Sequence, residues 1–159
     1  KWTMYDIITR TPLIVWAPGR FEPGREIDHL VQQMDIGPVI LQLAGAEVPE
    51  SLEAVSLMSA LRGDRAESAR RYVFAEQARD GVLTGTEMMT MVRSPHWKLV
   101  HYLGSDDGEL YDLQRDPGEH VNLWATPGYE HRREDLLRVM ADWMIESSLK
   151  TASWKIPFR

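Results

Sequence analysis

Glu109-Leu-Tyr-Asp-Leu-Gln-Arg-Asp-Pro-Gly-Glu-His-Val-Asn-Leu123 is a short strand that runs into an acidic turn and ends on a second apolar anchor. In the strand, Leu110 and Leu113 flank polar residues, and the preceding Gly104–Gly108 is rich in residues that reverse a chain. In the turn, a proline that presets φ precedes a glycine that accepts positive φ. The stretch therefore predicts the last strand of a hairpin followed by a tight loop.

Two further strands precede this one. Thr86–Arg93 and Trp97–Leu103 have the apolar, β-branched and aromatic content of strands and are joined around Ser94-Pro-His96. Together with Glu109–Leu113 they predict a three-stranded antiparallel meander. The meander becomes four-stranded if Tyr72–Glu76, which has similar content, joins it.

The last helix is marked by a broad apolar stripe. Thr126 is its predicted N-cap, Pro127 its first helical residue and Ser147 its approximate end. The stripe has helical spacing and is formed by Tyr129, Leu136, Leu137, Met140, Trp143 and Met144. Such a stripe predicts packing against a sheet.

The first third of the chain contains three apolar segments. Thr11–Trp16, with a proline at its entry, predicts a buried strand. A helix is predicted from about Asp35, with its apolar residues on one face, and Gly45 ends it. A short apolar segment follows and ends near Gly63.

Composition narrows the functional classes. With 159 residues, 43% hydrophobic and 26% charged, the chain is globular and long enough to bury a core. No apolar run approaches the roughly 18 residues that a membrane span needs. The net charge of −6 and the alternation of arginines with acids between 62 and 71 argue against nucleic-acid binding. The absence of cysteine excludes disulfides but does not identify the cellular compartment. Because no membrane span is predicted, we expect a soluble protein, cytoplasmic or periplasmic.

The residues alone indicate no catalytic constellation or metal motif. The histidines lack H-x-x-x-H spacing, and no serine lies in a G-x-S-x-G elbow. Asp106 and Asp107 fit a solvated hairpin end better than a calcium loop, which needs more oxygen ligands. Asp116 and Glu119 flank a Pro-Gly turn, where acids usually accept hydrogen bonds from the local backbone.

Three ordered segments nevertheless resemble one family. Glu109–Leu123 resembles the E-L-Y-D-L-x-x-D-P-x-E-x-x-N-L signature of sulfatases, the sulfuric ester hydrolases related to alkaline phosphatases, at every fixed position. Thr11–Gly19 is similar to the family's R-x-P-L-I-x-x-x-P-G segment. Met34–Pro49 is similar to its D-x-x-P-T-L-L-x-L-A-G-x-x-x-P helix.

The resemblance implies a C-terminal portion of a sulfatase that hydrolyses sulfate esters, of α/β class and α+β within this piece. Residues 1–63 would form the end of the large α/β catalytic domain. Residues 64–159 would form a small C-terminal subdomain, an antiparallel sheet packed against a C-terminal helix, with a tail. The family uses a formylglycine from a C/S-x-P-x-R motif and a divalent cation, calcium or magnesium. Neither that motif nor the metal ligands are in this chain, so the piece alone should be inactive.

One residue of the sulfatase site has a counterpart here. Lys1-Trp-Thr-Met-Tyr-Asp6 resembles the G-K-x-x-x-Y-E segment, whose lysine binds the sulfate oxygens, with Asp6 in place of glutamate. The resemblance implies that Lys1 binds the sulfate of a small sulfated substrate in the intact parent. A chain that starts inside this motif is expected to be a fragment, with Leu13–Trp16 exposed at its edge.

Two alternatives remain open. The parent could hydrolyse phosphonate or phosphate monoesters, because that part of the superfamily shares the metal site and the nucleophile position. Alternatively, the chain is a non-catalytic interaction domain that forms a homo-oligomer through its C-terminal tail, with Trp154–Phe158 as the arm.

Overall fold

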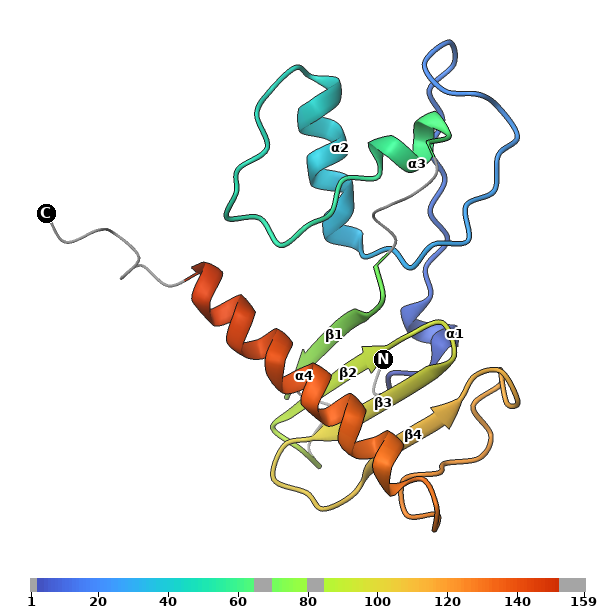
Figure 1. The fold of residues 1–159 in the computed structure, drawn as a ribbon, viewed down its shortest axis with the longest axis vertical. Helices are drawn as coiled ribbons and strands as arrows, with labels where there is room; N and C mark the ends of the chain where they lie inside the picture. Colours follow the sequence, from blue (N-terminus) through green and yellow to red (C-terminus); the bar gives the residue numbers. More distant parts are fainter. Residues whose placement is uncertain (1–2, 65–69, 80–84, 152–159) are drawn as a thin grey trace, which may run out of the picture. The chain divides into compact units, whose positions relative to one another are not determined.

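The computed structural model describes residues 3–64, 70–79 and 85–151, which form two compact units. One unit holds the residues up to Ile14 together with Arg71–Ala141, and the other holds Val15–Arg70 and the residues from Asp142 on. The helices are α1 (Asp6–Thr9), the 3-10 turn η1 (Gln33–Asp35), α2 (Ile36–Leu43), α3 (Met58–Arg62) and α4 (Glu130–Thr151). The strands are β1 (Val73–Ala78), β2 (Met88–Arg93), β3 (Trp97–Tyr102) and β4 (Gly108–Asp112) (Figure 1).

The strands form an antiparallel sheet in the order β1-β2-β3-β4. This confirms the meander, including the fourth strand near Tyr72–Glu76. Successive side chains of each strand point to opposite faces, and both faces of the sheet are buried. On one face Val92 pairs with Leu99, and Leu99 pairs with Leu110. On the other face Met91 pairs with Val100 and lies in a second apolar cluster.

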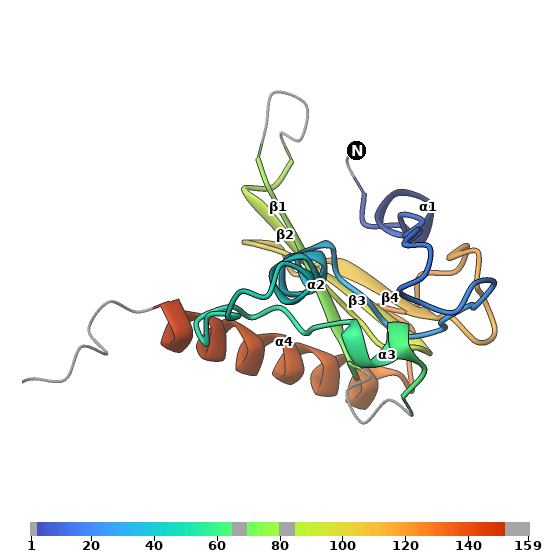
Figure 2. The ribbon, with the colours of Figure 1, turned by 90° about the horizontal axis from the view of Figure 1, so that it is seen from above.

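Helix α4 packs on the first face through Leu136 and Met140, which are 2% and 3% exposed (Figure 2). Each such side chain contributes roughly 1.5–3 kcal/mol on burial. The helix begins at Glu130 rather than at Thr126, so the predicted start was wrong. Gly128 has φ +93, a left-handed conformation that keeps the preceding Thr126–Pro127 out of the helix.

The outer edge of β4 is closed by the end of the motif. The Asn122 side chain accepts hydrogen bonds from the N–H groups of Leu110 and Trp124, both at 3.0 Å, and donates to the Gly108 carbonyl at 2.9 Å. Leu123 N–H donates to the Leu110 carbonyl at 2.8 Å. These bonds satisfy backbone groups that an open edge strand would leave for other chains.

The second unit is built around Asp35, which is fully buried. Its carboxylate accepts hydrogen bonds from the N–H groups of Gln32 and Val55 and forms an ion pair with Arg70 at 2.5 Å. Helix α2 follows Asp35, and Gly45 has positive φ just beyond its end, as the sequence predicted. The short apolar segment forms α3, which ends at a left-handed Gly63.

Thr11–Trp16 is not a strand, so this prediction was wrong. Ile14 and Trp16 are 87% and 85% exposed. An extended apolar segment becomes a buried strand only beside other strands, and none pairs with it in the described part of the chain. The exposure of these side chains agrees with the expectation that Leu13–Trp16 is uncovered in this chain. The boundary between residues 63 and 64 concerns the whole protein and stays a prediction.

Candidate functional site

Lys98 on β3 is completely buried and lies among charged residues. Its register partner on β2 is Arg93, so two positive side chains stand directly opposite each other. Like charges in this position are destabilising unless acids neutralise them. The Lys98 Nζ atom lies 2.9 Å from Asp6 Oδ1 and 2.7 Å from Glu119 Oε1. We call Asp6, Arg93, Lys98 and Glu119 the Lys98 cluster.

Asp6, the first residue of α1, is held through its side chain by both cations. Arg93 donates from Nε to Oδ1 at 3.1 Å and from Nη2 to Oδ2 at 2.9 Å, which is a two-pronged contact. Burial alone would raise the pKa of the Asp6 carboxyl. The hydrogen bonds and charges of Arg93 and Lys98 outweigh it and hold this pKa below its usual value.

Glu119 holds Asp6 through the backbone. Its Oε2 atom accepts a hydrogen bond from the Asp6 N–H at 2.6 Å. Glu119 directly follows the Pro-Gly turn and adopts φ +57, which is unusual for a residue other than glycine. The prediction that Glu119 serves its local backbone was therefore wrong. Asp116 does behave in that way, since its carboxylate accepts the Val121 N–H at 2.8 Å.

Residues next to Asp6 lie on the same face of the sheet. Met4 is 4% exposed and packs in the cluster of Met89, Met91 and Val100. The Tyr5 hydroxyl is 3.5 Å from that of Tyr111, and their ring centroids are 6.0 Å apart. The chain from Met4 to Asp6 is thus fixed to the sheet at each residue.

Two tyrosines on this face have raised pKa values. Burial is the main cause for both. The hydrogen bond between Tyr102 and the Glu109 carboxylate raises the pKa of Tyr102 further. For Tyr111 the additional causes are the hydrogen bond with Tyr5 and the charge of Glu109. Both phenols therefore stay neutral well above their ordinary range.

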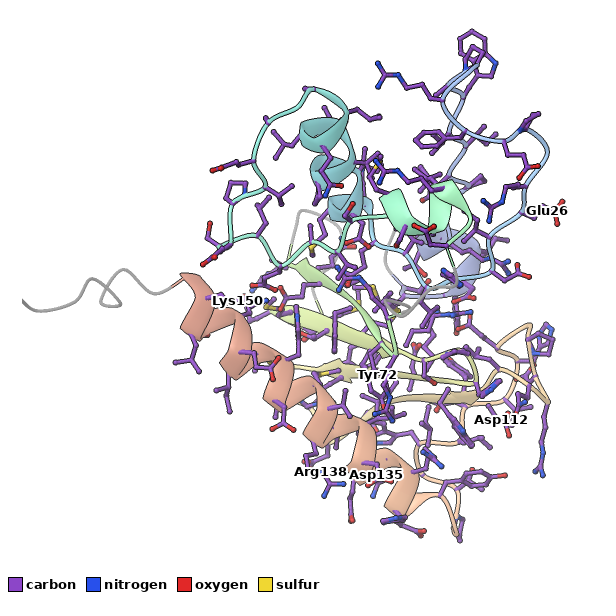
Figure 3. All side chains as sticks on the ribbon, turned by 45° about the horizontal axis from the view of Figure 1, so that its top comes forward. Glu26, Tyr72, Asp112, Asp135, Arg138 and Lys150 are labelled. Carbon is purple, nitrogen blue, oxygen red and sulfur yellow. The ribbon has the colours of Figure 1, made fainter. Side chains whose placement is uncertain are left out.

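Most fixed positions of the signature in Glu109–Leu123 have a structural partner. Glu109 accepts from Tyr102, Leu110 lies in the core, and Asp112, at the end of β4 (Figure 3), accepts the N–H groups of Gln114 and Arg115. Glu119 forms an ion pair with Lys98, and Asn122 closes the edge of β4. The motif therefore fixes the β4 strand and the loop after it to neighbouring parts of the chain.

The residues singled out in the sequence have different outcomes. Lys1 lies outside the described residues. Asp106 and Asp107 lie at the exposed end of the β3–β4 hairpin, as predicted. Within residues 3–64, 70–79 and 85–151, no three histidine, aspartate or glutamate side chains gather as metal ligands would. Sequence reasoning missed Lys98, and the signal that could have revealed it was the pairing of two basic residues across β2 and β3.

The Lys98 cluster is suited to hold a chain segment rather than to bind an anion. Two carboxylates balance its two cations, and Lys98 is closed to solvent. The cations therefore have no free capacity for a sulfate or phosphate group. What the cluster fixes is Asp6, five residues after Lys1.

Comparison with known proteins gives concordant matches. The model of the family "N-sulphoglucosamine sulphohydrolase, C-terminal" matches residues 1–146. A Delta 4,5-hexuronate-2-O-sulfatase of Bacteroides thetaiotaomicron is 33% identical over 97% of this chain and 32% of its own length. Human arylsulfatase K is 28% identical over 77% of this chain and 24% of its own.

Among solved structures, a phosphonate monoester hydrolase from Silicibacter pomeroyi matches with TM-score 0.80 and 27% identity, over 92% of this chain and 31% of that one. The chain spans about a quarter to a third of the length of the first curated relatives. In the part of the chain that the structure describes, no helix is long and apolar enough to cross a membrane. The match over residues 1–146 places this chain in the sulfatases, as a member of the N-sulphoglucosamine sulphohydrolase C-terminal family.

Proposed function

We propose that this chain is the C-terminal part of an enzyme that hydrolyses sulfate esters, in which Lys1 binds the sulfate oxygens. The observation that carries the proposal is the 33% identity with a hexuronate sulfatase along 97% of this chain. A compact ammonium group suits a tetrahedral anion whose negative charge moves to the leaving oxygen in the transition state.

The substrate class that we propose is a sulfated sugar. Relatives include a Delta 4,5-hexuronate-2-O-sulfatase and an N-acetylglucosamine-6-O-sulfatase. They differ in the position of the sulfate, which supports the class and leaves the position to experiment.

The family suggests a metal and a formylglycine in the parent, and we propose calcium or magnesium as the metal. The described residues of this chain do not fit either group. They contain no cluster of metal ligands, and the chain has neither cysteine nor a C/S-x-P-x-R sequence. This chain's contribution is therefore to bind and orient the sulfate through Lys1.

The test is kinetic and uses the full-length parent enzyme. Wild type and Lys1→Ala are assayed with an aryl sulfate and with a 2-O-sulfated unsaturated uronate. Loss of one stabilising donor should lower kcat about 10²–10³-fold. An active wild type with an unaffected Lys1→Ala variant contradicts the role of Lys1, and a wild type inactive on every sulfate ester contradicts the function.

A second candidate is a phosphonate or phosphate monoester hydrolase. The match with the phosphonate monoester hydrolase, TM-score 0.80 over 92% of this chain, favours it. Parallel assays of the parent on sulfate and phosphonate monoesters that share one leaving group decide between them. A higher kcat/KM for the phosphonate selects this candidate.

A third candidate is a homo-oligomer. On α4, Met144, Ile145 and Leu149 are 46%, 59% and 41% exposed and favour a contact there. The proposed arm Trp154–Phe158 lies outside the described residues. Size-exclusion chromatography with and without residues 150–159 tests it, and an unchanged monomer rejects it.

A further inference from the structure

We propose that Arg132 and the rings of Trp97 and Tyr129 form a separate, non-catalytic binding site for a sulfated sugar, in which Arg132 contacts the sulfate group. We call these three residues the Trp97 site. The inference rests on the proposed function, from which the sulfated-sugar class is taken. It goes further because it assigns to this chain a site outside the Lys98 cluster and outside the signature in Glu109–Leu123.

The Trp97 site lies where the first turn of α4 meets the start of β3. The Arg132 Cζ atom lies 5.1 Å from the centroid of the Trp97 ring. The rings of Trp97 and Tyr129 are tilted by 54°, with centroids 6.1 Å apart. Both rings pack against the apolar core beneath α4 and remain partly exposed, whereas Arg132 is exposed. The rings therefore hold a cation at a defined place on the surface.

The guanidinium of Arg132 has free hydrogen-bonding capacity. In the part of the chain that the structure describes, it forms no ion pair and no hydrogen bond. The nearby acids have other partners, since Glu130 accepts a backbone N–H at 2.8 Å and Asp135 pairs with Arg138 at 2.6 Å. Glu134 does not face Arg132, because residues two apart lie on different sides of a helix. Attraction to a ring uses none of the N–H donors, which form a planar fork suited to tetrahedral oxyanions.

The aromatic rings supply the other contact that a sugar requires. The faces of a sugar ring carry C–H groups, which pack on the flat apolar surface of an aromatic side chain, whereas its sulfate groups project from the edge. Because Arg132 already lies over Trp97, we expect the sugar to pack on Tyr129. An oriented cation beside a partly exposed ring therefore matches a sulfated sugar better than it matches a free anion.

The next residue, Arg133, shows how an arginine with a structural role differs. Its guanidinium lies 5.3 Å from the centroid of the Trp124 ring, much as Arg132 lies over Trp97. Arg133 is partly buried, however, and donates a hydrogen bond to the Trp124 carbonyl. Arg132 is oriented in the same way without such a bond. A side chain that is ordered before its ligand arrives loses less entropy on binding.

Binding to the 159-residue chain is measured by isothermal titration calorimetry at about 0.15 M ionic strength. The probes are a heparin tetrasaccharide, the same tetrasaccharide after complete desulfation, and sodium sulfate. We expect a measurable Kd for the first probe alone, because the site needs both the sulfate and the sugar ring. The net charge of −6 gives the chain no general attraction for anions.

Three variants test the role of Arg132. Arg132→Gln should raise the Kd of the sulfated tetrasaccharide about tenfold, and Arg132→Lys about threefold, because lysine keeps the charge and loses the planar fork. Arg138→Gln is the matched control and should leave this Kd unchanged. Arg138 is another exposed arginine of α4, and it pairs with Asp135 (Figure 3).

Kinetics of the full-length parent enzyme test whether the Trp97 site serves the reaction. Arg132→Gln should raise KM for the sulfated tetrasaccharide. It should leave kcat/KM for an aryl sulfate unchanged, because a single small ring does not occupy two sites. Equal changes in kcat/KM for both substrates would contradict a separate site.

The outcomes separate the two proposals. If Arg132→Gln alters Tm but not the Kd, Arg132 only covers the Trp97 ring and this inference is overturned. Equal binding of the sulfated and desulfated tetrasaccharides overturns it as well, and so does an Arg132→Lys variant that binds like wild type. An active parent whose C-terminal chain binds no tetrasaccharide contradicts this inference alone. A parent that hydrolyses no sulfate ester contradicts the proposed function, even where this chain binds the sulfated probe.

Discussion

Replacing Lys98 by methionine should strongly destabilise the 159-residue chain. Methionine has similar length and no charge, so the change leaves Glu119 without its cation and Asp6 with Arg93 alone. Lys98 is 0% exposed and the Glu119 side chain 3%, so solvent cannot compensate. Removing one partner of a buried pair costs about 3–5 kcal/mol. A domain of this size has a total stability of about 5–15 kcal/mol, so this is a large fraction.

A second substitution tests the cause. In Lys98→Met/Glu119→Gln, both charges of the 2.7 Å pair are gone and the acceptor for the Asp6 N–H remains. Since replacing a whole buried pair by neutral groups is often nearly neutral, the double variant should recover to within about 1–2 kcal/mol of wild type. The single variant would then be less stable than the double one.

The measurement is urea unfolding at neutral pH, followed by tryptophan fluorescence. Arg138→Met is the control, because it breaks the 2.6 Å pair with Asp135 on α4 (Figure 3), where Arg138 is 71% exposed. Such a surface pair contributes about 0–1 kcal/mol. A loss below about 1 kcal/mol for Lys98→Met, or a double variant less stable than the single one, would refute the reasoning.

Three further predictions follow from the same sheet. The lowered pKa of Asp6 stabilises the fold above the unfolded value of 3.8, and this contribution is lost as pH falls through the lower folded pKa; acid unfolding of Asp6→Asn should therefore depend less on pH than that of wild type. The raised pKa values of Tyr102 and Tyr111 stabilise the fold below the unfolded value of 10.0, and this contribution is lost as pH rises from there through the higher folded pKa values. Absorbance at alkaline pH should show these two phenols ionising only on unfolding, and early ionisation of all five tyrosines would contradict this. Gly108→Ala places a methyl group 2.6 Å from the Trp124 ring, so it should cost about 1–3 kcal/mol in urea unfolding and shift the tryptophan emission, whereas an unchanged midpoint would show that the ring moves freely.

The sheet and the last helix could be predicted because their signals are local. Alternation over β2 to β4 and the apolar stripe of α4 each lie within one element, and burial follows from periodicity. The start of α4 was misplaced because Thr126-Pro127 carries a strong cap signal. The left-handed conformation of Gly128 appears only once the turn is seen.

Thr11–Trp16 and the Lys98 cluster could not be predicted for a different reason. Whether an apolar segment becomes a buried strand depends on neighbours that its own sequence does not specify. The cluster joins Asp6 to residues that lie 87 to 113 positions later, and no local period connects them. The opposition of Arg93 and Lys98 follows from the β2–β3 register, which would have to be assigned before the pairing could be recognised.

The role of the signature follows from these contacts. Its leucines build the core, and Asn122 closes the edge of the sheet. Glu119 extends from a strained turn to a residue near the other end of the chain. A motif can therefore identify a family through the contacts that hold distant segments of its fold together. Here one buried lysine, two carboxylates and an arginine hold Asp6 against the sheet, which is why neutralising Lys98 alone should cost more than neutralising Lys98 and Glu119 together.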